Sequence, residues 1–476
     1  MSAPMPVIPC HANLFQDERQ LYRFLLTCQE KSSKKGNFQI VSFSQEIDFI
    51  DPLAFLQAND YPDQLHFYWE NCRQEEAIAA IDSIKSINIT SSDRFVKSQR
   101  FMQNCLKNIL RIGDTHLSGT KPCFFSSFTF FDSSTHSDCP FPPATVFLPK
   151  FQLTKRDKRC FFVANFTVNS QVNIELTFKK ITQQIKTLSL LRGNLIECTS
   201  GNREKLSQTE TNKTSQFKKS VASALKSIQD QHFSKIVIAH TFDIISPVTF
   251  HLVESLNNLR QRHPDCYIFS LSNGKGHNFI GASPERLISI QNNQLATDAL
   301  AGSAPRGKTT SEDVKLANQL LKSEKERREH QAVSNFITQR LCELGLNPVR
   351  SPLQLLQLSN IQHLWTPIYA QIPFNVHPLD IVAQLHPTPA VAGVPTEIAC
   401  EQIRHYETFD RSLYAAPLGW VDSQGNGEFI VGIRSALITG NHAQLYGGAG
   451  IVAGSDPDKE FAEVQLKLQS LLKALV

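Results

Sequence analysis

Several patterns that mark common protein classes are missing from this sequence. It has no run of 18 apolar residues, the length that a membrane-spanning helix requires, and its first residues, MSAPMPVIPC, lack the charged-then-apolar order of a secretion signal. The formal net charge is only +4, and no basic cluster with interleaved aromatic residues stands out. We therefore expect a soluble, cytoplasmic protein that binds neither a membrane nor a nucleic acid.

The cysteines also lack the spacing of a structural site. There are eleven of them, an odd number, and no two are spaced as C-x-x-C. Disulfide frameworks and zinc sites normally need paired or regularly spaced cysteines. We interpret these residues as buried or incidental thiols in a reducing compartment.

The composition is that of a large folded chain. Its 476 residues are 41% hydrophobic and 9% aromatic, which is enough for a sizeable core, and layered units of this kind can exceed 200 residues. The polar segment 197–215 predicts an exposed connector. Aromatic and β-branched runs before it predict strands at residues 38–43, 65–69, 123–125, 128–131, 144–148 and 161–168, the fifth ending at Pro149. This first half carries no catalytic constellation, and we interpret it as a scaffold.

The most distinctive stretch lies near the C-terminus, at residues 444–468. A short apolar strand runs into the glycine-rich residues 447–450, where the backbone can approach a ligand closely, and a polar turn leads to a helix. In that helix Glu460, Glu463 and Lys467 share one face. An acidic face beside a glycine-rich loop can hold a divalent cation against an anionic substrate. Taken alone, the same pattern is also that of a solvated helix face.

A second acidic helix is predicted over residues 323–344, with Gly345 as its stop. Glu326, Glu329 and His330 stand near its start. Its buried stripe is marked by Val333, Phe336, Ile337 and Leu341. Two helices with a Glu-x-x-Glu pair each can enclose one hard cation. Because Mg²⁺ normally takes only one or two carboxylates directly, we expect one glutamate per helix as ligand, the others behind, and His330 in the core or behind the ligands.

Two charged residues stand at the ends of predicted strands. Lys235 opens the strand 235–239, and Glu285 follows an irregular joint in a predicted antiparallel meander over residues 267–301. The lysine is either a charged strand end or, in a closed pocket, a base whose pKa is lowered by desolvation. The carboxylate is either a structural cap or a general acid. In both cases the sequence alone favours the structural role.

Nine segments of the second half resemble the chorismate-binding enzymes, the family of isochorismate, salicylate, anthranilate and aminodeoxychorismate synthases. They are SKIVIAH, GASPERL, LAGSAPRG, SEKERREH, LSNIQHLW, LHPTPAVAGVP, LYAAPLGWVD, VGIRSALI and YGGAGIVAGSDPDKEFAEVQLKL. The resemblance implies an α+β fold of the anthranilate synthase component I type, in which layered antiparallel β-sheets flanked by helices form one large unit. Residues 1–200 would be a divergent scaffold half of this fold, and residues 216–476 the chorismate-binding catalytic region.

The resemblance also implies roles for single residues. The base that activates water falls on Lys235, and the acid that protonates the departing C4 hydroxyl falls on Glu285. Positions that match the substrate-binding residues are Gly302, His363, Ala390, Tyr414, Arg434, Gly448, Ala449, Gly450 and Lys467.

The cofactor that the resemblance implies is Mg²⁺, with Glu329 and Glu463 as ligands and Glu326 and Glu460 behind them. This assignment is chemically coherent, because a substrate with two carboxylates needs a metal for one and a guanidinium fork for the other. A lysine and a glutamate on opposite faces of the ring can then exchange one hydroxyl for another.

Within the family the sequence favours an isochorismate synthase. Ala301 replaces the lysine of the aminodeoxychorismate type, and Ala390 stands where anthranilate and salicylate types tend to carry threonine. Water is therefore the expected nucleophile, with no amidotransferase subunit, a monomeric state, and menaquinone or phylloquinone synthesis as plausible pathways. Salicylate synthase, which goes on to eliminate pyruvate, is the alternative because Tyr414 occurs in both types. An ammonia-using synthase comes behind it.

Four positions depart from the family pattern, and two other classes of function were weighed. The departures are His240 for arginine, Ser303 for threonine, Ala392 for glycine and Glu326 for aspartate, and none removes a proposed catalytic group. A phosphate cradle is disfavoured, since no Lys-Ser/Thr follows the glycines and the next helix starts with acidic residues. A non-catalytic homologue is disfavoured because the proposed base, acid and metal ligands are intact.

Overall fold

The computed structural model describes residues 18–35, 38–59, 61–117, 119–133, 139–190, 207–209, 213–358 and 361–475. Its helices are α1 (Glu18–Lys35), α2 (Pro52–Ala58), α3 (Arg94–Leu106), α4 (Ile174–Leu190), α5 (Lys213–Gln229), α6 (Leu252–Arg262), α7 (Thr310–Lys322), α8 (Glu324–Glu343), α9 (Pro378–Leu385), α10 (Thr396–Tyr406) and α11 (Pro457–Leu475). No helix within these ranges is long and apolar enough to cross a membrane.

The strands before α5 are β1 (Gln39–Ile47), β2 (Leu65–Asn71), β3 (Glu76–Ile89), β4 (Ile109–Gly113), β5 (Cys123–Phe128), β6 (Ala144–Arg156), β7 (Arg159–Val168) and β8 (Ser207–Thr209). Those after it are β9 (Lys235–Ile245), β10 (Tyr267–Asn273), β11 (His277–Ser283), β12 (Arg286–Gln291), β13 (Gln294–Pro305), β14 (Val349–Arg350), β15 (Gln354–Gln357), β16 (Ile361–Gln371), β17 (Gly393–Val394), β18 (Pro417–Asp422), β19 (Gly427–Val431), β20 (Ser435–Thr439) and β21 (His442–Val452).

These strands join into one branched sheet. From β9 it runs through β21, β20, β11, β10, β2 and β3 to β6. At β6 it divides, with β7, β1 and β4 on one branch and β5, β18, β19, β12, β13 and β16 on the other. The pair β1–β4 is parallel, and the other pairings between described strands are antiparallel. The predicted α+β class with layered antiparallel sheets and flanking helices is confirmed.

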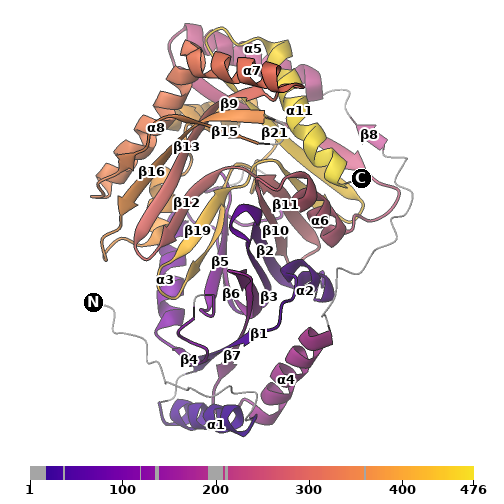
Figure 1. The fold of residues 1–476 in the computed structure, drawn as a ribbon, viewed down its shortest axis with the longest axis vertical. Coiled ribbons are helices and arrows are strands. Elements are labelled where there is room, and N and C mark those ends of the chain that lie inside the picture. Colours follow the sequence, from indigo (N-terminus) through magenta and orange to yellow (C-terminus); the bar gives the residue numbers. More distant parts are fainter. Residues whose placement is uncertain are drawn as a thin grey trace.

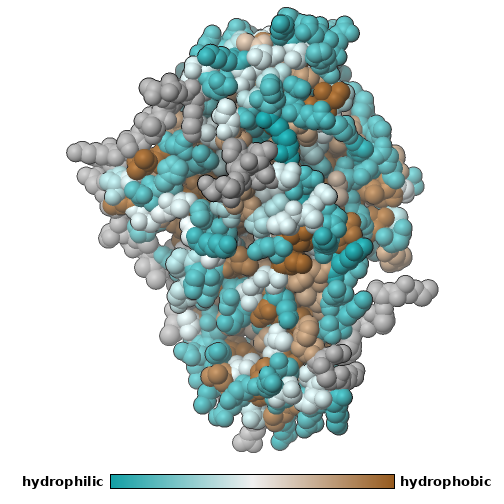
Figure 2. Space-filling view, turned by 180° about the vertical axis from the view of Figure 1, so that it is seen from behind, coloured by the Kyte–Doolittle hydropathy of each residue, from teal (hydrophilic) through white to brown (hydrophobic). Residues whose placement is uncertain are grey.

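Two stretches of this sheet, which we name the first and second arms, matter for function. The first arm is β9–β21–β20–β11–β10, and α5, α6 and α11 pack on it. The second arm is β18–β19–β12–β13–β16, and α7 and α8 pack against its far end. Figure 1 shows α8 and α11 on opposite sides of the upper half, with the indigo and purple N-terminal strands below them. The reverse face is mostly hydrophilic, with scattered apolar residues (Figure 2).

Five of the six predicted N-terminal strand runs coincide with strands, but residues 129–131 lie beyond the end of β5 and are not extended. The prediction that the strand after 144 ends at Pro149 is wrong, because β6 continues to Arg156. Pro149 pairs with Ser83 beside a register shift in β3, and a bulge tolerates a residue without an N–H donor. Most of the predicted connector 197–215 lies outside the described residues.

The predicted meander is wrong in its last step. β10 and β11 pair as expected, but β12 pairs with β13 and β19 and not with β11. The joint after β11 therefore carries the chain from the first arm to the second. It is fixed there by Val431, whose carbonyl accepts a hydrogen bond from the Ser283 hydroxyl at 2.6 Å and whose N–H donates to the Glu285 carbonyl at 3.1 Å.

Candidate active site

A cleft lies between the two arms and collects most of the predicted site residues. It contains about 840 Å³ of empty space, part of it open to solvent, which is within the usual size of small-molecule sites. Its walls include the predicted residues Glu285, Gly302, Glu329, His363, Ala390, Tyr414, Arg434, Gly448, Gly450, Glu463 and Lys467. These residues come from β13, β16, β21, α8, α11 and the loops beside them. The sheet therefore brings together positions nearly 200 residues apart.

Lys235 stands at the floor of this cleft as a buried cation. Its side chain is 4% exposed, and its Nζ donates to Glu329 Oε1 at 2.6 Å. A Cβ on Gly450 would lie 3.2 Å from Lys235 Cε and 3.4 Å from Glu329 Oε1. The lysine that the sequence treats as a charged strand end is thus held inside the molecule, next to a predicted metal ligand.

Glu285 is buried at the joint between the arms. Burial raises the pKa of its carboxyl group to about 7, against the opposing charge of Lys235 and with a further contribution from Asp298. The side chain makes no hydrogen bond or ion pair with any residue that the structure describes, and only the backbone of Glu285 is engaged in the joint. A carboxyl group of this kind holds its proton near neutral pH and can give it to a leaving group.

Four glutamates face one another between the starts of α8 and α11. Burial, then the charge of Glu329 and that of Glu463, raises the pKa of Glu326 despite Lys325 and a hydrogen bond from Ser303. Burial and Glu463 likewise raise the pKa of Glu460, against a hydrogen bond from Ser455. In contrast, Lys235 and two other lysines outweigh the effect of burial and hold the pKa of Glu329 below its ordinary value.

This donor set fits a hard divalent cation. Carboxylate oxygens are the ligands that Mg²⁺ prefers, and the mutual repulsion of the four glutamates is what a bound cation relieves. Within the described ranges, no three His, Cys, Asp or Glu side chains converge tightly enough to form a metal cage by themselves. The predicted set, one glutamate from each helix with water and substrate oxygens completing the octahedron, does not require such a cage. His330 is buried and bonds Thr366 Oγ1 at 2.8 Å, as expected for a core residue.

Two cationic side chains complete the electrostatics of the cleft. Lys467 Nζ lies 2.9 Å from Glu463 Oε1 and donates to the Gly448 carbonyl at 2.8 Å. Arg434 forms no ion pair with a carboxylate among the described residues; the contact found is with Cys266 Sγ, at 3.9 Å. A guanidinium that lines a cleft without a counter-anion is available to bind a carboxylate of a ligand.

The glycine-rich residues form a strand and not the loop predicted from the sequence. Residues 447–450 lie inside β21 and pair in register with β9, and α11 begins seven residues later at Pro457. Glycine is needed here for close approach: a Cβ on Gly448 would lie 2.9 Å from the Tyr414 hydroxyl. Ala449, the alanine of this run, is buried and does not line the cleft.

The aromatic wall contains one residue that the sequence analysis missed. Tyr446 stacks on Tyr414, with ring centroids 5.3 Å apart and planes at 14°, and both rings line the cleft. Tyr446 directly precedes the glycine run, which could have drawn attention to it. Opposite lies His363, whose pKa is lowered to about 3 by burial and by the charges of Arg434 and Lys467. Its Nε2 has no hydrogen-bond partner within the described structure, so a neutral imidazole is left for a ligand.

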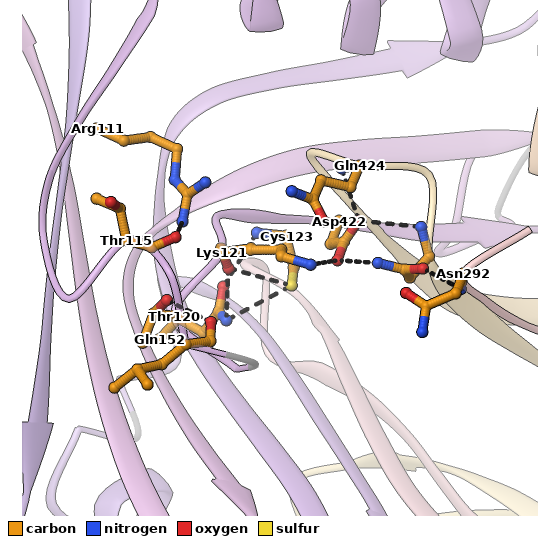
Figure 3. Close-up of polar contacts among 11 residues, drawn as sticks. Arg111, Thr115, Thr120, Lys121, Cys123, Gln152, Asn292, Asp422 and Gln424 are labelled. Atoms are coloured by element: carbon orange, nitrogen blue, oxygen red, sulfur yellow. Dashed lines mark hydrogen bonds and ion pairs between the residues drawn. The ribbon is translucent and has the colours of Figure 1, made fainter. Parts of the chain in front are cut away.

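A second polar cluster surrounds Asp422, on the side of the sheet near β5 and β6 (Figure 3). Lys121 Nζ lies 3.5 Å from Asp422 Oδ2, while the other oxygen accepts backbone hydrogen bonds from Gln424 and Asn426. Gln152 bonds the backbone of Cys123 and the Thr154 hydroxyl. These groups satisfy one another, and we regard the cluster as structural.

The chain was compared with known proteins. A family model described as "Chorismate binding enzyme" matches residues 23–476. Isochorismate synthase MenF of Bacillus subtilis (strain 168) is 29% identical over 474 residues, which cover 96% of this chain and 98% of that protein.

Two solved structures are similar to the model. One is MenF, the menaquinone-specific isochorismate synthase from Escherichia coli, with a TM-score of 0.77, 24% identity, and coverage of 98% of this chain and 100% of that chain. The other is anthranilate synthase component I from Streptococcus pneumoniae TIGR4, with a TM-score of 0.68, 19% identity, and coverage of 83% and 92%. The fold of these two proteins is the fold of this chain.

Proposed function

Since the chain belongs to the chorismate-binding enzyme family, we propose that it is an isochorismate synthase, an isomerase that converts chorismate to isochorismate. The observation that carries this proposal is the juxtaposition in one cleft of a buried lysine, a carboxyl group with a pKa near 7 and a guanidinium without a counter-anion. The relative from Bacillus subtilis, matched over nearly its whole length, bears that name.

In the proposed reaction Lys235 takes a proton from water as the water oxygen attacks C2 of chorismate. Glu285, protonated near neutral pH, gives its proton to the C4 hydroxyl, which leaves as a second water molecule. One water is consumed and one released, so the net change is an isomerisation. The two residues are close enough for the charge of Lys235 to affect the pKa of Glu285, which fits groups acting on one ring.

The substrate carboxylates are expected to bind at two places. Mg²⁺ held by Glu329 and Glu463 would supply positive charge for one of them. Arg434 is the candidate for the other, with the neutral His363 and the Tyr414 hydroxyl nearby. Glu326 and Glu460 would stand behind the metal ligands and hold the local charge in place.

Water is the proposed nucleophile because of two small residues in the cleft wall. Ala301 and Ala390 both line the cleft, at the positions where the ammonia-using and salicylate-forming types of the family tend to carry other residues. Within the cell, we propose that the protein acts in the cytoplasm as a monomer and supplies menaquinone synthesis. Restoration of menaquinone in a bacterium that lacks its own isochorismate synthase would test this pathway.

The direct test is product analysis of the purified protein with chorismate and Mg²⁺, without ammonia or glutamine. Isochorismate approaching an equilibrium mixture with chorismate is the expected result, and EDTA should abolish turnover until Mg²⁺ is added back. Salicylate plus pyruvate would identify the alternative type, and turnover only with ammonia would overturn the choice of nucleophile. Glu285→Gln, purified in the same way, excludes a contaminating activity. Turnover that is indifferent to EDTA would contradict the metal proposal.

A further inference from the structure

We propose that Arg411 is a positioning residue that holds three walls of the cleft together from behind, without lining the cleft itself. Arg411 lies between α10 and β18 and is completely buried. It stands outside the motifs that point to catalytic or binding residues. The kinetic part of this proposal rests on the proposed function, whereas its structural part does not.

The guanidinium joins two backbone segments that both line the cleft. Its Nη2 donates to the Val237 carbonyl on β9 at 2.8 Å, and its Nη1 donates to the Val391 carbonyl at 2.9 Å. Val237 follows Lys235 by two residues, and Val391 follows Ala390. A backbone hydrogen bond from Val237 N–H to the Ala392 carbonyl at 2.7 Å closes the same junction. Arg411 therefore fixes the segment of Lys235 relative to the segment of Ala390.

The third wall is Tyr414, three residues further along the chain. Its N–H donates to the Arg411 carbonyl at 2.7 Å, and the guanidinium carbon lies 5.9 Å from the centre of its ring. The same guanidinium lies 4.4 Å from the ring centre of Phe130. The turn that carries Tyr414 into the cleft is thus anchored to the residue that anchors β9.

The charge of Arg411 is fully paired at the back of the cleft. Its Nε donates to Glu407 Oε2 at 2.8 Å and its Nη2 to Glu407 Oε1 at 2.5 Å. Glu407 Oε1 also accepts the Ala239 N–H of β9, at 2.8 Å. A buried ion pair is costly to desolvate and is weak evidence for stability by itself. We infer that its value lies in geometry, because a planar fork can bind a carboxylate and two carbonyls at fixed angles.

The test compares Arg411→Lys with Arg260→Lys. Arg260 is a matched control, since it is also ion-paired, with Asp51 at 2.7 Å, but lies away from the cleft. Lysine keeps the charge of Arg411 but cannot bond both carbonyls and both Glu407 oxygens at once. For chorismate we expect KM to rise about tenfold or more in Arg411→Lys, with a smaller change in kcat, because small displacements of positioning groups are costly. Arg260→Lys should leave KM unchanged.

Amide hydrogen exchange gives a readout that needs no turnover. The amides of Val391 and Ala392 both donate to the Thr388 carbonyl, and they should exchange faster in Arg411→Lys and not in Arg260→Lys. If the wild-type protein converts no chorismate, the proposed function fails, and exchange at these amides still decides the role of Arg411. Unchanged exchange and unchanged KM in Arg411→Lys would overturn the proposal, as would an equal rise of KM in the control.

A double variant covers the case in which Arg411→Lys does not fold. Arg411→Met with Glu407→Leu removes both buried charges together, which is less damaging than leaving one unpaired. A folded double variant with faster exchange at Val391 and Ala392 supports the proposal, and wild-type exchange there overturns it.

Discussion

At the scale of single residues, burial decides which chemistry a side chain can perform. The sequence alone favours a charged strand end for Lys235 and a structural cap for Glu285. In the structure both side chains are buried, and the carboxyl group of Glu285 has no hydrogen-bond partner among the described residues while its backbone forms the joint. Burial of this kind depends on contacts between distant strands, so neither residue's local sequence could predict it.

The raised pKa of Glu285 predicts how activity depends on pH. A general acid must be protonated, and burial raises its pKa to about 7, so kcat/KM for chorismate should fall as the pH rises through about 7. Glu285→Gln cannot donate the proton and should lower turnover by about two orders of magnitude or more, with this limb of the profile lost. A wild-type profile that stays flat between pH 6 and 8.5, or a near-normal rate for the variant, would remove Glu285 from the proposed role.

A second buried carboxyl group predicts a pH dependence of stability. Burial raises the pKa of Glu428 to about 7, although a hydrogen bond from the Tyr267 hydroxyl at 2.6 Å and the charge of Arg286 oppose this. Because the folded pKa is above the unfolded one, Glu428 favours the folded state below about pH 4, and this contribution is lost as the pH rises to about 7. In urea titrations, Glu428→Gln should be less sensitive to pH than the wild type over this window. Parallel curves for the two proteins would contradict the prediction.

At the scale of elements, helices were predicted better than strand endings. The acidic helix expected over 323–344 is α8, one residue shorter at each end, and Gly345 follows it with a φ of +77°. Capping and period are local signals, and they suffice for a helix. The loop expected at 447–450 is a strand, because pairing with β9 holds the glycines extended. Pairing between distant strands is invisible to a local reading of glycine.

The helix caps give a matched pair of variants. Ser323 caps α8 by accepting the Glu326 N–H at 3.4 Å, and Thr309 caps α7 by accepting the Glu312 N–H at 3.3 Å. Replacing either by alanine should cost about 1 kcal/mol of stability. Only Ser323→Ala should also raise the Mg²⁺ concentration for half-maximal activity, roughly two- to tenfold, because 1.4 kcal/mol is a factor of ten. The reason is that Glu326 and Glu329 lie in the first turns of α8. An equal Mg²⁺ response in Thr309→Ala would refute this reasoning.

At the scale of the whole molecule, the family was predicted correctly and the strand order was not. Nine short strings identified the chorismate-binding enzymes, because residues that must meet one ligand tolerate few alternatives, and the family model confirms this. The sheet instead depends on registers such as Trp69 with Phe269 and Trp420 with Phe125, which link positions about 200 and 300 residues apart. The composition of a strand specifies that it pairs and not with which partner.

These long-range pairings predict that the catalytic region cannot fold alone. In a fragment of residues 207–476, β10 would lose its neighbour β2 and β18 would lose β5, which leaves two unpaired edges. Buried aromatic residues such as Trp420 would also lose their cover, since its ring packs edge-on against Trp69 at 6.3 Å. We therefore expect the fragment to aggregate or to show no cooperative thermal transition by circular dichroism.

Co-expression with residues 1–206 supplies the control, because a break within the polar segment leaves both pairings possible. The two pieces should co-purify and convert chorismate with a KM close to that of the intact chain. A fragment 207–476 that is soluble, melts cooperatively and turns over chorismate by itself would show that the N-terminal strands are dispensable. That result would make the first 200 residues a separate domain and would move the structural basis of the cleft entirely into the second half.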